Sequence, residues 1–332
     1  MPTELLPFPH HCPSAYRPLV QEPSFEPQRH LALEPPKDIW RLVDLGYSDH
    51  TISDCATDVA IAGPFRLLSD EGVTALREVA LALREERTSS HRTASFVTGG
   101  VYRSAFVRGL CQSPDVAAFL SLLCNTQIAP HSIPSQQAYI NYAPDNTMRA
   151  VDPWHVDSIG LDSVLMVSDP TKFDGGEFQF FQGTIHEAAS LFGTTTDRLP
   201  KGHLEGLPQD RIETLPFPGP GYAIFQQGHL VVHRATRLTR PAERITLVTG
   251  YIPCDIRYRD ATNIIEIATW AEPGLLSELA RHSAWLACAK LRQLITDPPK
   301  VDDPKAISEA LSGAVADIER TLQSIRNLSA KL

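Results

Sequence analysis

The stretch Trp154-His155-Val156-Asp157 places an imidazole and a carboxylate two residues apart. Residues two apart on a β-strand point to the same face of a sheet, so these two side chains can reach one metal ion. A lone His-x-Asp pair is more often an ordinary surface or core pair, however. The prediction of a metal site therefore depends on what the rest of the chain adds to it.

Later parts of the chain supply the missing pieces. His233 offers a second imidazole, and Arg244 and Thr246 share one face of a further predicted strand. Two imidazoles and one carboxylate leave coordination positions open, which suits Fe(II) oxygenases because cosubstrate and dioxygen must bind the same ion. A guanidinium with an adjacent hydroxyl is a good clamp for a carboxylate. We therefore expect a metal centre with an anion clamp beside it.

The sequence around these residues predicts a β-rich core. From about residue 136 the chain changes to short apolar runs that are separated by turn residues. A series of such strands is typical of an antiparallel sandwich or barrel. The predicted strands are 137–142, 154–158, 161–168, 177–181, 221–226, 230–233 and 244–252, with an irregular insertion at about 182–214.

The segments on either side of the β region have different patterns. Residues 1–40 are rich in proline, which blocks helix interiors and central strands, so we expect an extended arm. Aromatic residues such as Phe8, Tyr16 and Phe25 can bury part of this arm on its own domain or on a partner subunit. The expected organisation is an arm at 1–40, a β domain with buttressing helices at 41–270 and a helical hairpin at 271–332.

Capping residues and helical periodicity locate the predicted helices. Ser69 can cap a helix over 69–87, and Ser113, followed by proline, can begin another. Residues 95–107 are expected to form strands or loops. In the C-terminal hairpin, apolar residues recur at helical spacing over 275–295 and 304–332. This hairpin can serve as a buttress or as a homodimer surface.

Composition and charge narrow the partners. The chain has 332 residues and a formal net charge of -9, and it has no block of basic residues, which argues against nucleic acid and anionic membranes as partners. Its six cysteines form no C-x-x-C motif, which favours a reducing cytoplasm. No signal peptide pattern and no apolar run of membrane-spanning length is visible. We expect a cytoplasmic protein with a small-molecule substrate.

The order His155-x-Asp157, distal His233 and Arg244-x-Thr246 resembles the Fe(II)/2-oxoglutarate-dependent oxygenase superfamily. The glycine turn at 174–180 and the run 221–225 are similar to segments of its prolyl-hydroxylase-like branch. The resemblance covers about residues 136–254. It implies a double-stranded β-helix, or jelly-roll, core. The predicted fold is therefore mainly β, with flanking helices and a C-terminal helical hairpin.

The resemblance also implies roles for individual residues. Iron(II) would be held by His155, Asp157 and His233, with no catalytic side chain beyond these ligands. The cosubstrates would be dioxygen and 2-oxoglutarate, and Arg244, helped by Thr246, would hold the far carboxylate of 2-oxoglutarate. Family members often place a further partner for 2-oxoglutarate on the first core strand. The candidates for this partner here are Tyr139 and Asn141, with Tyr142 as a rival on the other face.

Other candidates are weighed against ordinary structural roles. His229 competes with His233, but His233 precedes Arg234-Ala235-Thr236, which is similar to the distal motif of the family. Substrate contacts are predicted at Trp154, Gln137 and Arg149, although a buried tryptophan is more often plain core and an arginine is usually solvated. Two further arginines, Arg103 and Arg237, are weaker candidates for an acidic substrate. The histidines of the insertion, His186 and His203, are not expected to be ligands.

The predicted function is oxidation of an unactivated carbon–hydrogen bond of a small molecule, such as an amino acid or a specialised metabolite. Hydroxylation, desaturation or cyclisation would accompany conversion of 2-oxoglutarate to succinate and carbon dioxide. Related halogenases have alanine or glycine at the position of Asp157, so the aspartate disfavours halogenation. The alternatives are a protein hydroxylase of the same superfamily, a non-redox metal enzyme on a cupin-like barrel, and a binding protein that has lost catalysis.

Overall fold

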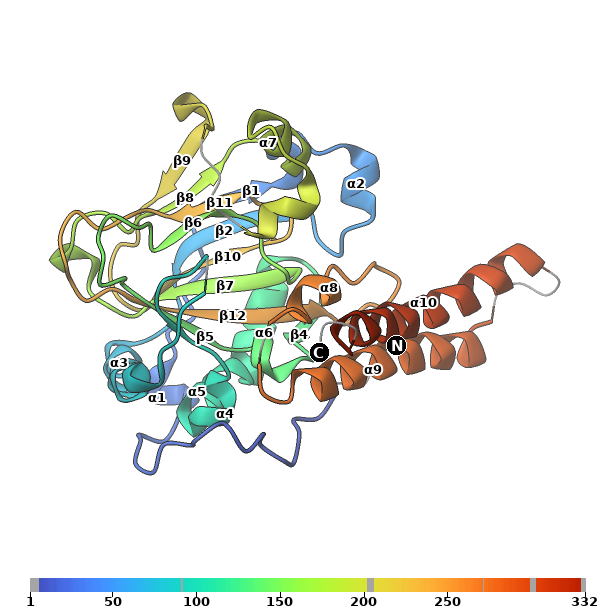
Figure 1. Cartoon of the computed structure of the whole chain (residues 1–332), viewed down its shortest axis with the longest axis horizontal. Coiled ribbons are helices and arrows are strands. Elements are labelled where there is room, and N and C mark those ends of the chain that lie inside the picture. Colours follow the sequence, from blue (N-terminus) through green and yellow to red (C-terminus); the bar gives the residue numbers. More distant parts are fainter. Residues whose placement is uncertain (1–5, 91, 202–205, 271, 299–302, 330–332) are drawn as a thin grey trace.

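Two antiparallel β-sheets form the centre of the computed structural model, which describes residues 6–90, 92–201, 206–270, 272–298 and 303–329 (Figure 1). The strands are β1 (Ile39–Arg41), β2 (Val59–Arg66), β3 (Phe96–Val97), β4 (Ile128–Pro130), β5 (Tyr139–Tyr142), β6 (Asp152–His155), β7 (Leu161–Met166), β8 (Phe178–Phe181), β9 (Ile212–Leu215), β10 (Tyr222–Gln226), β11 (His233–Ala235) and β12 (Ile245–Pro253). The larger sheet has the order β1-β2-β10-β7-β12-β5-β3, with β4 paired to β12. The smaller sheet has the order β6-β11-β8-β9.

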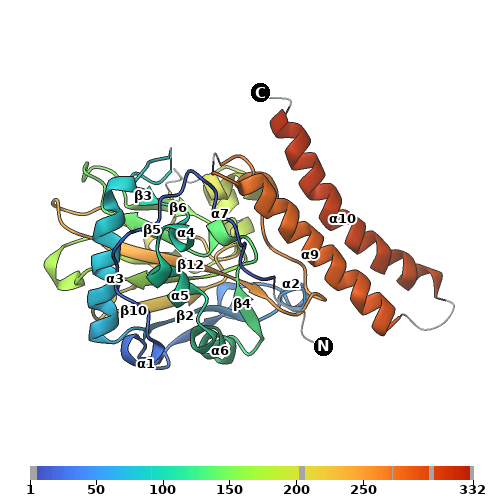
Figure 2. The same cartoon turned by 90° about the horizontal axis from the view of Figure 1, so that it is seen from below.

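Helices cover the outer side of the larger sheet, one short helix packs on the smaller sheet, and two long helices extend the molecule at one end (Figures 1 and 2). They are α1 (Pro27–His30), α2 (Asp49–Ser53), α3 (Asp70–Leu83), α4 (Gly100–Arg103), α5 (Ala105–Cys111), α6 (Pro114–Leu123), α7 (Ile185–Leu191), α8 (Ile264–Ile267), α9 (Leu275–Thr296) and α10 (Pro304–Ser329). Where the structure describes the chain, no helix is both long enough and apolar enough to span a membrane.

Two hydrophobic cores follow from this layering. Between the helices and the larger sheet, Leu76 of α3 and Phe106 of α5 belong to one buried cluster with Leu247 of β12. Between the two sheets, Phe180 of β8 and Ile224 of β10 belong to a second cluster. Alternation along each strand supplies these contacts, because every second side chain points toward the core.

One of the two capping predictions for the buttressing helices is confirmed, and both helices begin where the sequence indicated. The Ser69 hydroxyl accepts a hydrogen bond from the Gly72 amide at 3.0 Å, so α3 begins where the sequence indicated. Helix α6 begins at Pro114, but the Ser113 side chain makes no capping hydrogen bond. The α-helix of α3 ends at Leu83, and a short 3-10 turn continues to Glu86.

The segment 95–107 corrects a prediction. Apart from the short strand β3, it forms α4 and the start of α5 rather than strands or loops. The Ser104 hydroxyl caps α5 by accepting from the Val107 amide at 3.0 Å. Val101, Phe106 and Val107 are fully buried, so the helical turns are stabilised by the core that they cover.

Two strand boundaries near the predicted ligands also differ. Strand β11 begins at His233 rather than at residue 230, because Leu230 and Val231 bond back to the Gln227 carbonyl in a turn. Strand β6 ends at His155, so Asp157 lies just beyond it. The Asp157 amide donates to the Gly228 carbonyl at 2.8 Å. The loop backbone, rather than strand alternation, therefore places the carboxylate.

The proline-rich arm lies along the helices of its own chain, which is the first of the two placements considered for it (Figure 2). Tyr16 is buried, and its ring stacks on Tyr102 with centroids 5.1 Å apart. Phe25 packs edge-on against Phe106 at 5.5 Å. The Leu19 amide donates to the Arg103 carbonyl at 2.8 Å.

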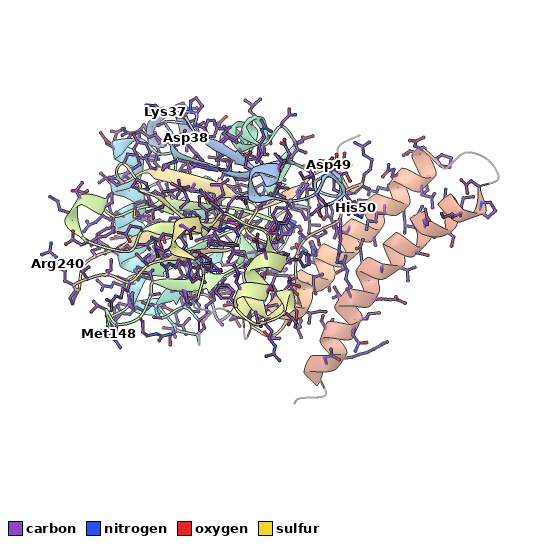
Figure 3. The ribbon with its side chains drawn as sticks, turned by 90° about the horizontal axis from the view of Figure 1, so that it is seen from above. Lys37, Asp38, Asp49, His50, Met148 and Arg240 are labelled. Carbon is purple, nitrogen blue, oxygen red and sulfur yellow. The ribbon has the colours of Figure 1, made fainter. Side chains whose placement is uncertain are left out.

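The predicted C-terminal hairpin is present as α9 and α10. Both helices project away from the β-sheets (Figures 1 and 2). In Figure 3 the labelled side chains of Met148 and Arg240 lie at the end of the molecule away from this hairpin. The Asp303 carboxylate accepts hydrogen bonds from the Lys305 and Ala306 amides, each at 3.1 Å, and so caps α10.

Candidate metal centre

Three predicted ligands meet between two strands of the smaller sheet. His155 of β6 and His233 of β11 are directly opposite each other in the antiparallel register, and their ring centroids are 4.2 Å apart. One ligand atom from each of His155, Asp157 and His233 lies within 4.8 Å of the others. Neighbouring strands put opposing side chains about 5 Å apart, which suits two ligands of one ion.

The ring nitrogens are oriented for metal binding. His155 Nδ1 lies 2.7 Å from the Pro153 carbonyl oxygen, and His233 Nδ1 lies 2.9 Å from that of Val231. A carbonyl oxygen only accepts, so each Nδ1 carries the proton and each Nε2 keeps its lone pair. The Nε2 atoms lie 3.4 Å and 3.3 Å from the two Asp157 carboxylate oxygens. Backbone carbonyls behind metal-ligating histidines are a usual arrangement, and this donor set fits a divalent transition metal.

Burial and local charge keep the ligands in their metal-binding forms. Burial, reinforced by His155, lowers the pKa of His233 to about 4. Burial opposes ionisation of Asp157, but the imidazoles of His233 and His155 and the Arg92 guanidinium hold its pKa below the usual value. A neutral imidazole and a carboxylate are the forms that bind metal, so neither ligand needs to lose a proton at neutral pH.

His229 takes a different position from His233. Its Nδ1 lies 3.0 Å from the Gly160 carbonyl oxygen, and it is not part of the three-residue group. Burial lowers the pKa of His229 as well. Of the two histidines that competed in the sequence, the structure brings His233 to the carboxylate. His186 is exposed on α7, and His203 lies outside the described residues.

A buried amide and a second carboxylate support Asp157 from behind. The Gln226 Nε2 lies 3.0 Å from Asp162 Oδ1 and 3.3 Å from Asp157 Oδ2. Asp162 is fully buried, and burial together with the Asp157 charge raises its pKa. A Cβ atom at Gly228 would lie 2.2 Å from Asp162 and 2.4 Å from Asp157, so glycine is needed for this close approach. The support from Gln226, Asp162 and Gly228 was not predicted, although Asp162, an aspartate inside an apolar strand, was a signal for it.

The predicted anion clamp is buried and sterically fixed. Arg244 is only 2% exposed, and its Nε donates to the Gly176 carbonyl at 2.9 Å. Gly176 has a positive φ of 70°, and a Cβ there would lie 2.7 Å from Arg244 Cδ and Nε. Burial lowers the pKa of Arg244 to about 10, so the guanidinium stays charged at neutral pH. The glycine turn therefore has a physical role, because it makes room for this arginine and orients it.

The other predicted cosubstrate residues lie next to the clamp. Thr246 of β12 is paired with Asn141 of β5, and both are buried. Asn141 Oδ1 has no protein hydrogen-bond partner in the described part of the chain. A buried amide oxygen without a partner is costly, so this atom marks a place where a ligand or water is expected. Tyr139 on the same strand stacks on Phe96 with centroids 4.7 Å apart.

One cavity of about 430 Å³ connects the ligands and the clamp. Such a volume lies within the usual range for small-molecule sites. The cavity is lined by all seven residues predicted for metal and cosubstrate: Tyr139, Asn141, His155, Asp157, His233, Arg244 and Thr246. The structure thus brings together side chains from β5, β6, β11 and β12 and from the loop after β6.

The three predicted substrate residues do not line this cavity. Trp154 points to the other side of β6, where it is buried with Phe181 under the Arg234 guanidinium, 4.5 Å above its ring. Gln137 follows a 3-10 turn that breaks the strand alternation, and it donates to the His131 carbonyl at 2.6 Å. Arg149 is exposed in the loop between β5 and β6. The prediction of substrate contacts at these three residues stays a prediction, and their side chains lie outside the cavity wall.

The cavity contains residues that sequence reasoning missed. Arg92 is half-buried beside the predicted metal ligands, and its Nε lies 3.2 Å from Asp152 Oδ1. Burial disfavours its charge, but Asp152 and Asp157 hold the pKa of Arg92 above its usual value. Glu266 and Trp270, in and just after α8, line the cavity from the C-terminal side. Arg92 lies in a polar loop without periodicity, and no pattern in the sequence indicated that it faces the site.

Comparisons with known proteins give distant likenesses. No family model and no curated protein matches the sequence. Among solved structures, the non-heme alpha ketoglutarate dependent carbocyclase SnoK from nogalamycin biosynthesis is 15% identical, covering 62% of this chain and 83% of that chain with a TM-score of 0.41. EctD from S. alaskensis, with bound Fe, is 15% identical, covering 68% and 85% with a TM-score of 0.41. HygX from Streptomyces hygroscopicus, with nickel and 2-oxoglutarate bound, is 14% identical, covering 61% and 85% with a TM-score of 0.38. These ligands belong to those proteins, and the chemistry of this chain rests on its own residues.

Proposed function

We propose that this protein is an Fe(II)- and 2-oxoglutarate-dependent oxygenase that oxidises a small molecule. The observation that carries the proposal is the shared cavity. It contains three convergent metal-ligand side chains, His155, Asp157 and His233, and a buried cationic clamp, Arg244 with Thr246. A metal site alone fits many activities. The fixed guanidinium beside it indicates a dicarboxylate partner of the metal.

The strand order supports a double-stranded β-helix as the core. Four strands of the larger sheet, in the order β5, β12, β7 and β10, pack against the four strands β6, β11, β8 and β9 of the smaller sheet. Strands β5, β6, β7 and β8 lie in the larger and the smaller sheet in turn, as they would in a jelly roll. Strand β9 stays in the smaller sheet, and β10 returns to the larger one. We propose that β1, β2 and β3 extend this core and that the helices buttress it.

Each side chain has a defined task in the proposed enzyme. His155, Asp157 and His233 hold the iron, while Pro153 and Val231 carbonyls keep the imidazoles oriented. When bound, iron and 2-oxoglutarate supply the oxidising chemistry, with succinate and carbon dioxide as products. Arg244 and Thr246 bind the far carboxylate of 2-oxoglutarate. Asn141 offers its side-chain amide nearby.

The rest of the cavity suits a polar small molecule. Its outer wall carries hydroxyl groups from Thr88, Ser90 and Thr93, together with the Glu266 carboxylate and the Trp270 ring. A few polar groups on an otherwise apolar lining orient a ligand and give specificity. The volume of about 430 Å³ must hold both the cosubstrate and the substrate. This limit favours a compact substrate over a folded protein segment.

The test is metal-dependent turnover of 2-oxoglutarate. Protein purified without oxygen should convert 2-oxoglutarate to succinate in air only after addition of Fe(II), and Zn(II) should not replace it. His155→Ala should abolish the conversion, whereas the exposed His186→Ala should leave it unchanged. A non-redox metal enzyme would hold zinc tightly and form no succinate under any condition, which would refute the proposal.

A further inference from the structure

Helix α10 buries its polar side and exposes its apolar side. Toward α9 it presents the buried small or polar residues Ala314, Asp317, Thr321 and Ser324, each at most 4% exposed. On its outer side it presents Leu311, Val315, Ile318 and Leu322, which are 43–50% exposed. An amphipathic surface helix normally has the opposite arrangement, with its apolar stripe toward the rest of the protein. We call the outer set, Leu311, Val315, Ile318 and Leu322, the aliphatic seam.

Specific contacts fix this orientation of α10. The Lys290 ammonium of α9 lies 2.7 Å from the Asp317 carboxylate, which is 1% exposed. The hydroxyl groups of Ser283 and Thr321 bond to each other across the two helices. Turning α10 to bury the aliphatic seam against α9 would break both contacts and leave Asp317 with only Arg320 of its own helix as a cation. Losing a cationic partner is strongly unfavourable for a buried carboxylate, so the seam stays on the outside of the hairpin.

The spacing of the seam is that of a helix-pairing surface. Its four residues are separated by four, three and four positions, which is the a/d repeat of a coiled coil. The neighbouring residues Ser312 and Ala316 are small and uncharged, so another helix can approach closely. Charged groups are typically depleted at the centre of such interfaces. Ile307, one turn earlier and 38% exposed, lengthens the apolar surface toward the start of the helix.

We propose that the aliphatic seam pairs with the same seam of a second copy of this chain. The hairpin projects from the body, so its outer side is open to another hairpin along its length (Figures 2 and 3). Antiparallel pairing about a point between Ala316 and Asp317 sets Leu311 against Leu322 of the second copy and Val315 against its Ile318. A self-complementary patch of this kind is what a two-fold dimer needs. An anionic membrane or nucleic acid would require a cluster of basic residues beside the seam, whereas the charged residues that adjoin it in the sequence, Asp317 and Glu319, are acidic.

The size of the seam predicts a concentration-dependent dimer. A helix of 26 residues is about 39 Å long and about 10 Å wide, which gives a flat footprint of roughly 400 Å² per copy. Specific interfaces commonly bury about 800 Å² of accessible surface per partner. Leu291 and Ile295 of α9, which are 40% and 79% exposed, lie on the same hairpin and can add to this area. The pairing is therefore near the lower size limit, and we expect a dissociation constant of about 1–10 µM.

Sedimentation velocity of the full chain tests this inference. Between about 1 and 100 µM the average mass should rise from that of one chain toward that of two. The double variant Val315→Lys/Ile318→Lys should raise the dissociation constant at least about tenfold, because it places charges in the buried centre of the pairing. Both side chains are exposed in the single chain, so the melting temperature of the dilute variant should match that of the natural protein.

The matched control is Leu122→Lys, which changes an 81% exposed leucine on α6. It should leave the dimer intact. A chain that stays monomeric up to about 100 µM would overturn the proposal and leave the seam for a different partner. An unchanged dimer in the double variant, or an equal loss with Leu122→Lys, would also overturn it. None of these measurements depends on iron or on 2-oxoglutarate, so they are independent of the proposed activity.

Discussion

Two pairs of buried histidines in this protein have different surroundings. In the metal centre, each Nδ1 of His155 and His233 is satisfied by a backbone carbonyl, and both Nε2 atoms lie near the Asp157 carboxylate, with the Gln226 amide 3.1 Å from His233 Nε2. In the second pair, His131 and His282, every ring nitrogen has a protein partner at 2.6–3.1 Å. The first pair therefore presents its Nε2 atoms to a carboxylate in a cavity, whereas the second pair does not line that cavity.

The second pair belongs to a structural network that joins α9 to the body. His282 Nδ1 lies 2.6 Å from the Ser132 hydroxyl, and its Nε2 lies 3.0 Å from the Asp260 carboxylate. This order of serine, histidine and aspartate is that of a nucleophilic triad. His282 is fully buried, however, and Ser132 does not line the site cavity. Hydrogen bonds from His282 and Thr262 outweigh burial and hold the pKa of Asp260 below its usual value.

The comparison shows what separates a reactive cluster from a structural one. Both clusters contain two histidines and one aspartate, and both are withdrawn from solvent. They differ in whether both Nε2 atoms converge on one carboxylate and whether a cavity reaches them. Matched changes in the two clusters should therefore have different effects on activity and on stability.

The largest expected effect comes from removing a metal ligand. His155→Gln should lower iron-dependent formation of succinate by more than about 100-fold, since loss of a residue behind a ligand already costs 10- to 100-fold. The melting temperature of the metal-free protein should change by only a few degrees. Succinate measured by mass spectrometry and a thermal melt would check both statements. Retained turnover in this variant would remove His155 from the metal centre.

The next effect concerns the clamp. Gly176→Ala should raise the KM for 2-oxoglutarate by about 10- to 100-fold, because the added methyl group meets Arg244 and displaces the guanidinium. Steady-state kinetics at saturating iron would measure it.

Gly193→Ala is the matched control for this variant. Gly193 also has a positive φ, of 65°, but a Cβ there meets no described atom within 4 Å. Both variants carry similar backbone strain, so an equal rise in KM for the two would show that Arg244 is not involved.

A change in the structural network should affect stability and leave iron binding intact. His282→Gln removes the partner of a buried carboxylate, which typically costs about 3–5 kcal/mol. The melting temperature should fall by roughly 5–10 °C, given about 2 °C per kcal/mol in a chain of this size. Iron bound per folded chain should stay the same. Loss of iron binding without loss of stability would reverse the assignment of the two clusters.

The smallest effect is a pH dependence of stability. Burial, with His282 nearby, lowers the pKa of His131 from 6.5 to about 3. The unfolded chain takes up a proton as the pH falls below about 6.5, whereas folded His131 stays neutral, so stability falls from pH 6.5 toward pH 3. The slope from this group is at most about 1.4 kcal/mol per pH unit. Urea unfolding of metal-free protein at pH 7 and pH 5 should show a smaller loss of unfolding free energy for His131→Gln than for the natural protein. An equal loss in the two proteins would contradict this role of His131.

Much of the site was predictable because its residues break the local pattern. His155, Asp157 and Arg244 are polar side chains in or next to predominantly apolar strands, and their order along the chain suggested one centre. Strand β2 was not predicted, because Pro64 lies inside it and proline argues against a central strand. The register of β2 against β10 is irregular beside this proline, which lets the sheet accommodate it.

The remaining misses come from contacts between distant segments. Arg92 reaches the cavity from a polar loop, and its position depends on an ion pair with Asp152 that no sequence period encodes. The Ser132–His282–Asp260 network joins three segments in the same way. Trp154 adjoins a ligand in the sequence, but neighbours on a strand face opposite sides, and its side chain is buried with Phe181 away from the cavity.

The central claim is that one cavity binds iron and 2-oxoglutarate together, and calorimetric titration of 2-oxoglutarate without oxygen tests it most directly. With one equivalent of Fe(II), one 2-oxoglutarate should bind per chain. Without metal, or in Asp157→Ala, binding should be lost or weakened at least about tenfold. Equal binding with and without Fe(II), or full binding in Asp157→Ala, would contradict the account.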